Sequence, residues 1–295
     1  MVWGEALRAV DRAIEVLRRQ PLIVRLGRPE SVAVLGDVHG YDDVVDRFEQ
    51  LVDEFSIDVA VMLGDYVDRG PNSAQTILKV LSLVSSEPNR FIALRGDHED
   101  PRMNEGYGFY EEALYTQSLD LFNEVVEAYK HMPLAAVSDE ALFVHGGIPC
   151  ANCSQQERPA LLSELEAQYG YIKGTQRYLE LSDEALFQML WNDPSGSDEY
   201  FEPNPRGPGI YYYGRLAWGS FLRANGLSYI VRGHEVVDGL LILRHDGKPM
   251  TARCDSWISK SDLQGSVVTV FSSRYHGGRS GALIINRDGA SLKCL

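Results

Sequence analysis

The chain begins with short apolar runs that alternate with segments of helical spacing. The apolar runs lie at about 31–36, 58–63 and 90–95, and the helical segments between them lie at about 42–54 and 72–86. A short apolar run bounded by turn residues is typical of a buried strand. Strands that alternate with helices predict parallel β-α-β units. The first part of the chain therefore predicts an α/β fold.

The remaining pattern is less regular. Helical spacing continues over about 104–131, and a hairpin follows at 134–137 and 141–144 with Ser138-Asp139-Glu140 as its turn. A segment rich in proline and glycine, Asp193 to Gly209, is predicted to be a long loop, and loops of this length are usually functional or disordered. Helical patches are expected at about 155–170 and 183–190, and further strands at 229–231, 239–243, 267–271 and 282–285.

The architecture expected from this order is one catalytic domain over residues 1–295. Two packed mixed β-sheets flanked by helices, an α/β (α+β) arrangement, account for the pattern without a linker or repeats. An N-terminal helix at about 4–20 places apolar residues such as Val10 and Ile14 on one face, which indicates a packing helix rather than a signal peptide. No apolar run is long enough to span a membrane, so we expect a cytoplasmic protein.

The net charge and the cysteine positions argue against two classes of function, nucleic-acid binding and structural zinc binding. The 42 acidic and 28 basic residues give a net charge of −14, which argues against a nucleic-acid partner, although a local cationic site could still bind phosphate. Cys150 and Cys153 form a C-x-x-C pair, but Cys254 and Cys294 do not supply a second pair, which disfavours structural zinc. The sequence leaves the state of Cys150 and Cys153 open; a disulfide would fit a hyperthermophile.

Chemically active residues follow the predicted strands, beside glycine. In chain order the strings are GDVHG at 36–40, GDYVDRG at 64–70, RGDHE at 95–99, HGG at 145–147 and RGHE at 232–235. Four of the seven histidines, His39, His98, His145 and His234, occupy such positions. Ligands bind at the carboxyl ends of strands in open α/β sheets. Carboxylate and imidazole together suit a divalent transition metal, so we predict a metal site there.

These strings resemble the signatures of the phosphoprotein phosphatase (PPP) branch of the calcineurin-like metallophosphoesterases, which are GDxHG, GDxVDRG, GNHE, HGG and RGH or RAH. The similarity covers residues 31 to about 276, and segments at 190–194, 204–214 and 270–273 also resemble the family. The resemblance implies a four-layer fold of two packed mixed sheets. It also implies a stand-alone enzyme of archaeal or prokaryotic type, and no regulatory subunit is evident.

The resemblance further implies two divalent metal ions, with manganese the first choice and iron or zinc as alternatives. One ion would bind Asp37, His39 and Asp65. The second would share Asp65 and add three ligands, which are Asp97, His145 and His234. Such a pair clamps phosphate and supplies a bridging hydroxide that attacks phosphorus in line.

The family pattern also assigns the remaining catalytic roles. Arg69 and Arg206 would bind the phosphate oxygens as planar donors. His98 would contact the phosphate and protonate the leaving oxygen, with Asp68 orienting its imidazole. For the aromatic residue near the metals and phosphate, Tyr275 and His276 are both candidates.

One predicted ligand departs from the family. Asp97 stands where the family has Asn, so an ionised Asp97 lowers the formal charge of the centre by one unit. This change should bind metal more tightly, weaken its Lewis acidity and repel phosphate. Asp97 is either native or an engineered change that slows the enzyme.

Three functions compete at this point. The leading one is a metal-dependent protein phosphatase acting on phosphoserine and phosphothreonine, with phosphotyrosine as a further substrate, in proteins or peptides. The second is a dinucleoside polyphosphate hydrolase, which uses similar motifs. The third is a catalytically impaired phosphopeptide-binding module in which Asp97 silences turnover.

Overall fold

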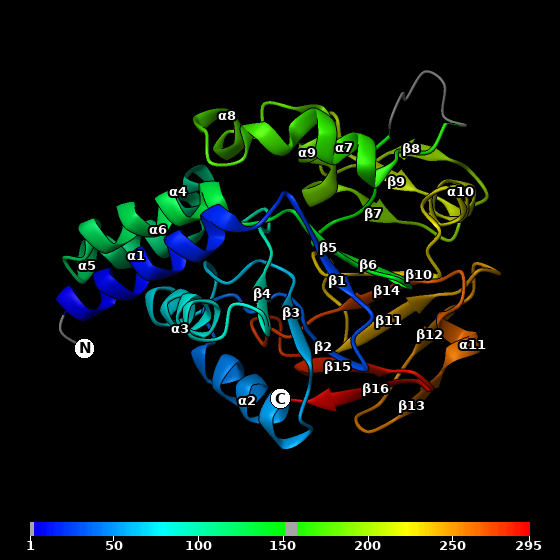
Figure 1. Ribbon diagram of the computed structural model, residues 1–295, viewed down its shortest axis with the longest axis horizontal. Coiled ribbons are helices and arrows are strands. Elements are labelled where there is room, and N and C mark those ends of the chain that lie inside the picture. The colour runs from blue at the N-terminus through cyan, green and yellow to red at the C-terminus, as the bar shows by residue number, and fades with distance from the viewer. Residues whose placement is uncertain (1–2, 151–157) are drawn as a thin grey trace.

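The computed structural model describes residues 3–150 and 158–295 (Figure 1). A six-stranded sheet has the order β13-β16-β15-β2-β3-β4. Its strands are β2 (Ser31–Leu35), β3 (Val59–Met62), β4 (Phe91–Ala93), β13 (Trp257–Ser259), β15 (Gly281–Asn286) and β16 (Gly289–Cys294). The three strands β2, β3 and β4 run parallel, as the apolar runs predict.

A second, seven-stranded sheet has the order β1-β5-β6-β10-β14-β11-β12. Its strands are β1 (Ile23–Gly27), β5 (Ala135–Ser138), β6 (Ala141–Val144), β10 (Tyr229–Arg232), β11 (Leu240–Leu243), β12 (Pro249–Thr251) and β14 (Val267–Val270). The predicted hairpin is confirmed, because β5 and β6 pair antiparallel. Both sheets are mixed, as expected.

The two sheets pack face to face around a shared apolar core. Val34 and Val61 of the six-stranded sheet meet Phe143 and Val231 of the other in one buried cluster. Burial of branched and aromatic side chains from both faces stabilises such a sandwich by roughly 1.5–3 kcal/mol per side chain. The predicted ligands follow the carboxyl ends of β2, β3 and β4 in one sheet and of β6 and β10 in the other.

Helices cover the outer faces. One group packs with the six-stranded sheet in a second core: α1 (Trp3–Arg19), α2 (Asp42–Glu54), α3 (Ser73–Ser86), α5 (Phe109–Tyr115) and α6 (Leu119–His131). The other group packs with the seven-stranded sheet: α7 (Leu162–Tyr169), α8 (Gln176–Leu179), α9 (Glu184–Trp191) and α10 (Arg215–Asn225). The arrangement is the expected four layers (Figure 1).

The N-terminal helix α1 is the packing helix that the spacing predicts. Val10, Ile14 and Leu17 are buried, and α1 contacts α3 and α6. Within the described residues, no helix is both long and apolar enough to cross a membrane.

The prediction of a loop over Asp193 to Gly209 is wrong in part. Two short strands lie there, β7 (Asp193–Pro194) and β8 (Phe201–Pro203), and both pair with β9 (Tyr211–Tyr213) in a small third sheet. Prolines are tolerated because these strands are short and lie at the edges.

The predicted helical stretch over 104–131 is divided. α4 (Pro101–Tyr107) ends at Gly108, whose φ of 122° is incompatible with a continuing helix, and α5 and α6 follow separately. Sequence patterns did not predict β1, β12, β13, β16, α10 or the short helix α11 (Lys260–Leu263).

A disulfide joins Cys254 to Cys294 at the end of β16, with the two Cα atoms 5.4 Å apart. The sequence did not predict this pairing. Cys153 lies outside the described residues, and so do residues 155–157 of the predicted helical patch at 155–170.

Candidate metal centre

The predicted ligands meet where five strands end. Asp37 and His39 follow β2, Asp65 follows β3, and Asp97 follows β4. The histidines come from the other sheet, His145 after β6 and His234 after β10. All six are at most 7% exposed. The structure therefore brings together every residue predicted to bind metal.

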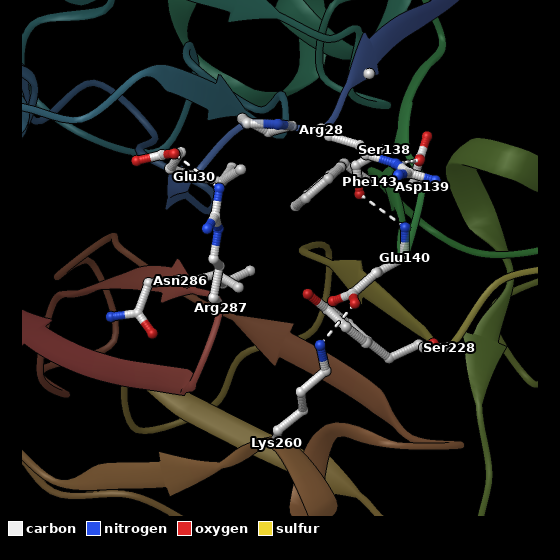
Figure 2. Close-up of a pocket in the computed structure, with 15 residues that line it drawn as sticks. Arg28, Glu30, Ser138, Asp139, Glu140, Phe143, Ser228, Lys260, Asn286 and Arg287 are labelled. Atoms are coloured by element: carbon white, nitrogen blue, oxygen red, sulfur yellow. Dashed lines mark hydrogen bonds and ion pairs between the residues drawn. The ribbon is translucent and has the colours of Figure 1, made fainter.

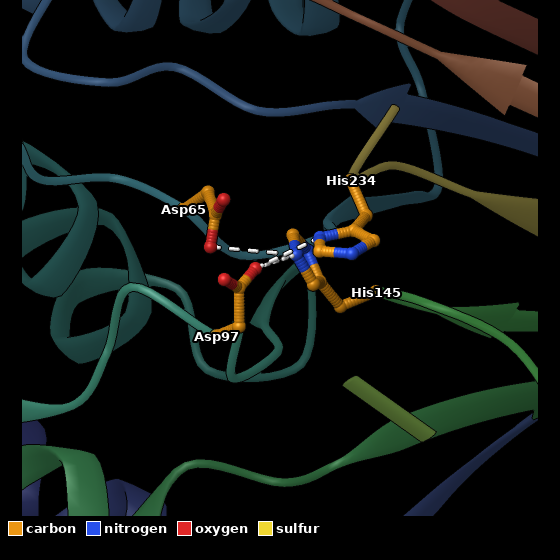
Figure 3. A group of neighbouring side chains, drawn as sticks. All are labelled: Asp65, Asp97, His145 and His234. Atoms are coloured by element: carbon orange, nitrogen blue, oxygen red, sulfur yellow. Dashed lines mark hydrogen bonds and ion pairs between the residues drawn. The ribbon is translucent and has the colours of Figure 1, made fainter. Parts of the chain in front are cut away.

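The tighter cluster contains Asp65, Asp97, His145 and His234, whose side chains point toward one another in Figure 3. One oxygen of Asp97, Oδ1, lies 2.8 Å from Nε2 of His145 and 2.9 Å from Nδ1 of His234. Nε2 of His145 is also 3.4 Å from Oδ1 of Asp65. Two carboxylates and two imidazoles thus face a single point.

Another cluster, the first cluster, contains the ligands of the first predicted ion and shares Asp65 with the tighter one, the second cluster. Nε2 of His39 lies 3.5 Å from Oδ2 of Asp65 and 4.0 Å from Oδ2 of Asp37. The ring of His98 lies close to His39 and Asp65, and the three side chains together could also bind a metal ion. Asp65 is therefore the carboxylate common to both clusters.

The fit to metal ions can be judged from how the rings are held. Nδ1 of His39 lies 3.0 Å from the carbonyl of Val67, and Nδ1 of His145 lies 3.0 Å from the carbonyl of Leu63. Each bond leaves Nε2 directed at the cluster, the arrangement by which metal-binding histidines are usually oriented. The donor set and its orientation therefore fit two divalent cations.

The backbone of the site is strained in a consistent way. The left-handed φ angles of five non-glycine residues in the site lie between 52° and 70°; these residues are His39, Asp65, Asp68, Arg69 and His234. Such angles cost free energy and cluster at functional sites. Asp and His tolerate this region better than branched residues do.

Glu99 supports the loops, a role that sequence reasoning missed. Its carboxylate accepts hydrogen bonds from the backbone N–H groups of Asp65, Tyr66 and Gly96 at 2.7, 2.9 and 2.8 Å. Gly96 is required there, because an added Cβ would lie 2.3 Å from Oδ1 of Asp65. The position of this acidic residue at the end of the RGDHE string is the sequence feature that could have indicated the role of Glu99.

The surroundings of Asp65 and Asp97 shift the pKa values of the two carboxyl groups in opposite directions. Burial, followed by the charges of Asp97 and Asp37, raises the pKa of Asp65 well above its usual value. Burial also opposes ionisation of Asp97, but His234 and His145 outweigh it and hold the pKa of Asp97 well below its usual value. A cation between the two groups would offset their repulsion.

The predicted dyad is present beside the clusters. Nδ1 of His98 lies 2.7 Å from Oδ2 of Asp68, and both side chains are buried. This contact leaves Nε2 of His98 available for another group. The arrangement has the geometry of an oriented acid or base.

Arg69 lies beside the dyad between two aromatic rings. Its guanidinium carbon is 4.5 Å from the ring centre of Tyr107 and 5.2 Å from that of Tyr275. The guanidinium contacts the aromatic rings through cation–π interactions. Among the described residues, no carboxylate pairs with its N–H groups.

Arg206 is held differently. Its Nε donates to Oδ2 of Asp193 at 2.7 Å, and its side chain is 37% exposed. Oδ1 of the same Asp193 accepts from the buried Arg232 at 2.8 Å and lies 3.9 Å from Nε2 of His234. Asp193 therefore connects Arg206 to the second cluster, a link that the sequence did not predict.

The two aromatic candidates occupy different places. The ring of Tyr275 lies 5.2 Å from that of His39, edge to face. His276 packs against Phe271, with ring centres 4.7 Å apart, and against Tyr275, whose own ring centre lies 5.9 Å from that of Phe271. Tyr275 is therefore the residue of the pair that contacts a predicted ligand.

A cavity of about 680 Å³ lies elsewhere, and none of the predicted site residues lines it (Figure 2). Its charged side chains are paired with each other: Arg28 with Asp139, Arg287 with Glu30 at 2.7 Å, and Lys260 with Glu140 at 2.6 Å. This cavity is therefore not the predicted metal site, because the predicted metal ligands do not line it.

Comparisons with known proteins show the family of this chain. The calcineurin-like phosphoesterase family matches residues 31–238. A catalytic chain of protein phosphatase 2A from Dictyostelium discoideum is 33% identical over 265 residues, covering 88% of this chain and 79% of that protein. Serine/threonine-protein phosphatase PP2A-like PPG1 of Candida albicans is 29% identical over 265 residues, covering 88% of this chain and 59% of that protein.

Solved structures show the same fold. A serine/threonine phosphatase of Saccharomyces cerevisiae with similarity to human phosphatase PP5 superposes with a TM-score of 0.79 at 25% identity, covering 100% of this chain and 90% of that chain. A cold-active protein-tyrosine phosphatase of Shewanella reaches a TM-score of 0.61 at 17% identity, covering 95% of this chain and 84% of that chain. The second likeness concerns the fold alone.

Proposed function

Because the chain belongs to the calcineurin-like phosphoesterase family, we propose that it hydrolyses phosphoserine and phosphothreonine monoesters in proteins or peptides. The observation that carries this proposal is the pair of ligand clusters joined by Asp65, with the His98–Asp68 dyad beside them. The relatives named as serine/threonine phosphatases support the choice of substrate.

The ligands would be divided between two divalent ions as the motifs predict. Asp37, His39 and Asp65 would hold one ion. Asp65 would bridge to a second, held also by Asp97, His145 and His234. When bound, two such ions polarise the phosphoryl group and lower the pKa of water. Manganese is our proposal, and iron and zinc suit the same donors.

The other side chains bind the substrate and move its proton. Arg69 and Arg206 bind the phosphate oxygens, and the free N–H groups of Arg69 allow a bidentate contact. His98 carries a proton on Nε2 and donates it to the leaving serine or threonine oxygen. Asp68 accepts from Nδ1 of His98 and stabilises the imidazolium form that carries this proton.

We also propose that residues 1–295 act as a single catalytic domain, since ligands come from both sheets. The cytoplasm is the proposed compartment, although the Cys254–Cys294 disulfide is unusual for a reducing compartment outside hyperthermophiles. Cell fractionation with thiol labelling of Cys254 and Cys294 would test the compartment.

Substrate choice decides between the competing functions. With Mn²⁺ present, phosphate release is measured from a phosphoserine peptide, a phosphotyrosine peptide and a dinucleoside tetraphosphate. We expect the phosphoserine peptide to have the highest kcat/KM. A higher value for the dinucleotide would replace the proposal with the polyphosphate hydrolase. Tight peptide binding without phosphate release, in the chain and in Asp97→Asn, would indicate the silent binding module.

A further inference from the structure

A buried asparagine on α4 contacts both members of the dyad. Nδ2 of Asn104 donates to Oδ2 of Asp68 at 2.8 Å and to the backbone carbonyl of His98, also at 2.8 Å. The Asp68 oxygen involved is the one that accepts from Nδ1 of His98. Asn104 is fully buried. Its amide therefore ties the carboxylate of the dyad to the backbone of the histidine.

The orientation of this amide is fixed from the other side. Oδ1 of Asn104 accepts a hydrogen bond from the hydroxyl of Tyr129 on α6 at 3.2 Å. If the amide were flipped, Oδ1 would face a carboxylate and a carbonyl, both of which only accept. Three hydrogen-bond partners thus specify one orientation, with the NH₂ group toward Asp68.

The remaining contacts of Asp68 show why the amide matters. Oδ1 of Asp68 accepts from the backbone N–H of Phe109 at 3.0 Å, and Asp68 itself has a left-handed φ of 70°. A buried carboxylate stays ionised and in place only when donors satisfy it. Asn104 supplies a neutral donor to the same oxygen that holds His98.

We propose that Asn104 is a positioning residue for His98, acting through Asp68, with Tyr129 fixing its amide. This inference rests on the proposed role of His98 as the group that protonates the leaving oxygen. Loss of the amide lets the carboxylate and imidazole shift, so proton delivery weakens while phosphate binding by the arginines remains.

The test uses two substrates that differ in their need for a proton. A serine leaving group requires protonation, whereas p-nitrophenolate leaves without it. We expect Asn104→Leu to lower kcat on a phosphoserine peptide about 10-fold, which is part of the roughly 100- to 10,000-fold contribution of a general acid. The kcat on p-nitrophenyl phosphate should fall less than about 3-fold, with KM nearly unchanged on both.

Matched variants separate positioning from stability. Asn225→Leu removes an asparagine that bonds the backbone N–H of Leu162 and the carbonyl of Ala160, away from the site. It should not change the ratio of the two kcat values. Tyr129→Phe removes only the hydroxyl and should change this ratio in the same direction as Asn104→Leu, but less. An unchanged ratio in folded Asn104→Leu overturns the inference.

A second readout does not depend on turnover. The Nδ1 proton of His98, bonded to Asp68, should give a low-field proton NMR signal that weakens or shifts in Asn104→Leu and persists in Asn225→Leu. If the unmodified protein hydrolyses neither substrate, the proposed function fails. The signal then still decides the inference, because an unchanged signal in Asn104→Leu contradicts it and a lost signal supports the positioning of His98.

Discussion

The two ligand clusters share Asp65 but hold their histidines in different ways. In the first, burial lowers the pKa of His39 well below its usual value, so the ring is neutral and ready to bind a metal. In the second, His145 and His234 both lie within 3 Å of one oxygen of Asp97. Despite burial, bonding to Asp97 raises the pKa of His145.

This difference would make the two proposed metal positions unequal. The second cluster has two carboxylates and two imidazoles around one point, so it should bind a cation more tightly. The first cluster adjoins His98, whose ring centre is 4.8 Å from that of His39, and Tyr275, which contacts Arg69. We infer that the second position anchors metal, while the first lies next to the groups that handle substrate.

The largest effect should come from the shared carboxylate. Asp65→Asn removes the charge common to both clusters, so both ions bind weakly and phosphate release falls by about 1000-fold or more. Metal content after desalting and kcat on a phosphopeptide provide the measurement. Asp46→Asn, at an exposed carboxylate paired with Lys79, is the control. Retention of two tightly bound ions by Asp65→Asn would contradict a bridging role.

The next effect is a pH dependence that separates the clusters. Metal binding requires neutral imidazole, and the pKa of His145 is raised while that of His39 is lowered. As pH falls through the raised pKa of His145, affinity at the second position should drop by about 10-fold per pH unit. Protonation of the shared Asp65, whose pKa is also raised, weakens both positions, so the second position should lose affinity more steeply than the first. Mn²⁺ titrations of metal-depleted protein from pH 8.5 to about 6 measure both affinities, and a parallel fall would rule out this asymmetry.

A smaller change is expected from restoring the family residue. Asp97→Asn removes one negative charge, so the second ion should bind about 10-fold more weakly, and turnover at saturating Mn²⁺ should rise several-fold. The two parameters are read from kcat as a function of Mn²⁺ concentration. A fall in turnover at saturating Mn²⁺ would show that the charge of Asp97 does not slow the reaction.

The smallest effect concerns the aromatic contact to the first cluster. Tyr275→Leu removes the ring beside Arg69 and His39 and should raise KM about 2–5-fold through the loss of a cation–π contact. His276→Leu, at the adjacent residue that packs on Phe271, should leave KM closer to its original value. Equal effects of the two substitutions would show that the loop acts as a unit.

Much of the site was predictable because its chemistry sits in local strings. The residues after β2, β3, β4, β6 and β10 combine an apolar run, a glycine and a ligand, and each of these signals is local. Asn104 and Tyr129 gave no such signal, because they act through hydrogen bonds between segments far apart in sequence. Asp193 lies in the segment 190–194 that resembles the family, but its bond to Arg232 also joins distant segments and was not predicted.

The errors in the fold have similar causes. Prolines argued against strands at β7 and β8, but strands at the edge of a sheet tolerate proline. β1 is also an edge strand, and Arg25 interrupts its apolar run. The choice between Tyr275 and His276 depended on one residue of register in a loop, and only the folded loop shows that the ring of Tyr275 contacts His39. The Cys254–Cys294 bridge depends on the placement of β16, which the pattern did not predict.

The central claim is that two metal ions joined by Asp65 carry out phosphate hydrolysis. Metal-depleted protein is titrated with Mn²⁺, and bound Mn²⁺ and phosphate release from a phosphoserine peptide are measured on the same samples. If Asp65 joins two ions, we expect two binding events: the tighter one gives almost no activity, and activity appears as the second ion binds. Full activity with one bound ion, or with none, would contradict it.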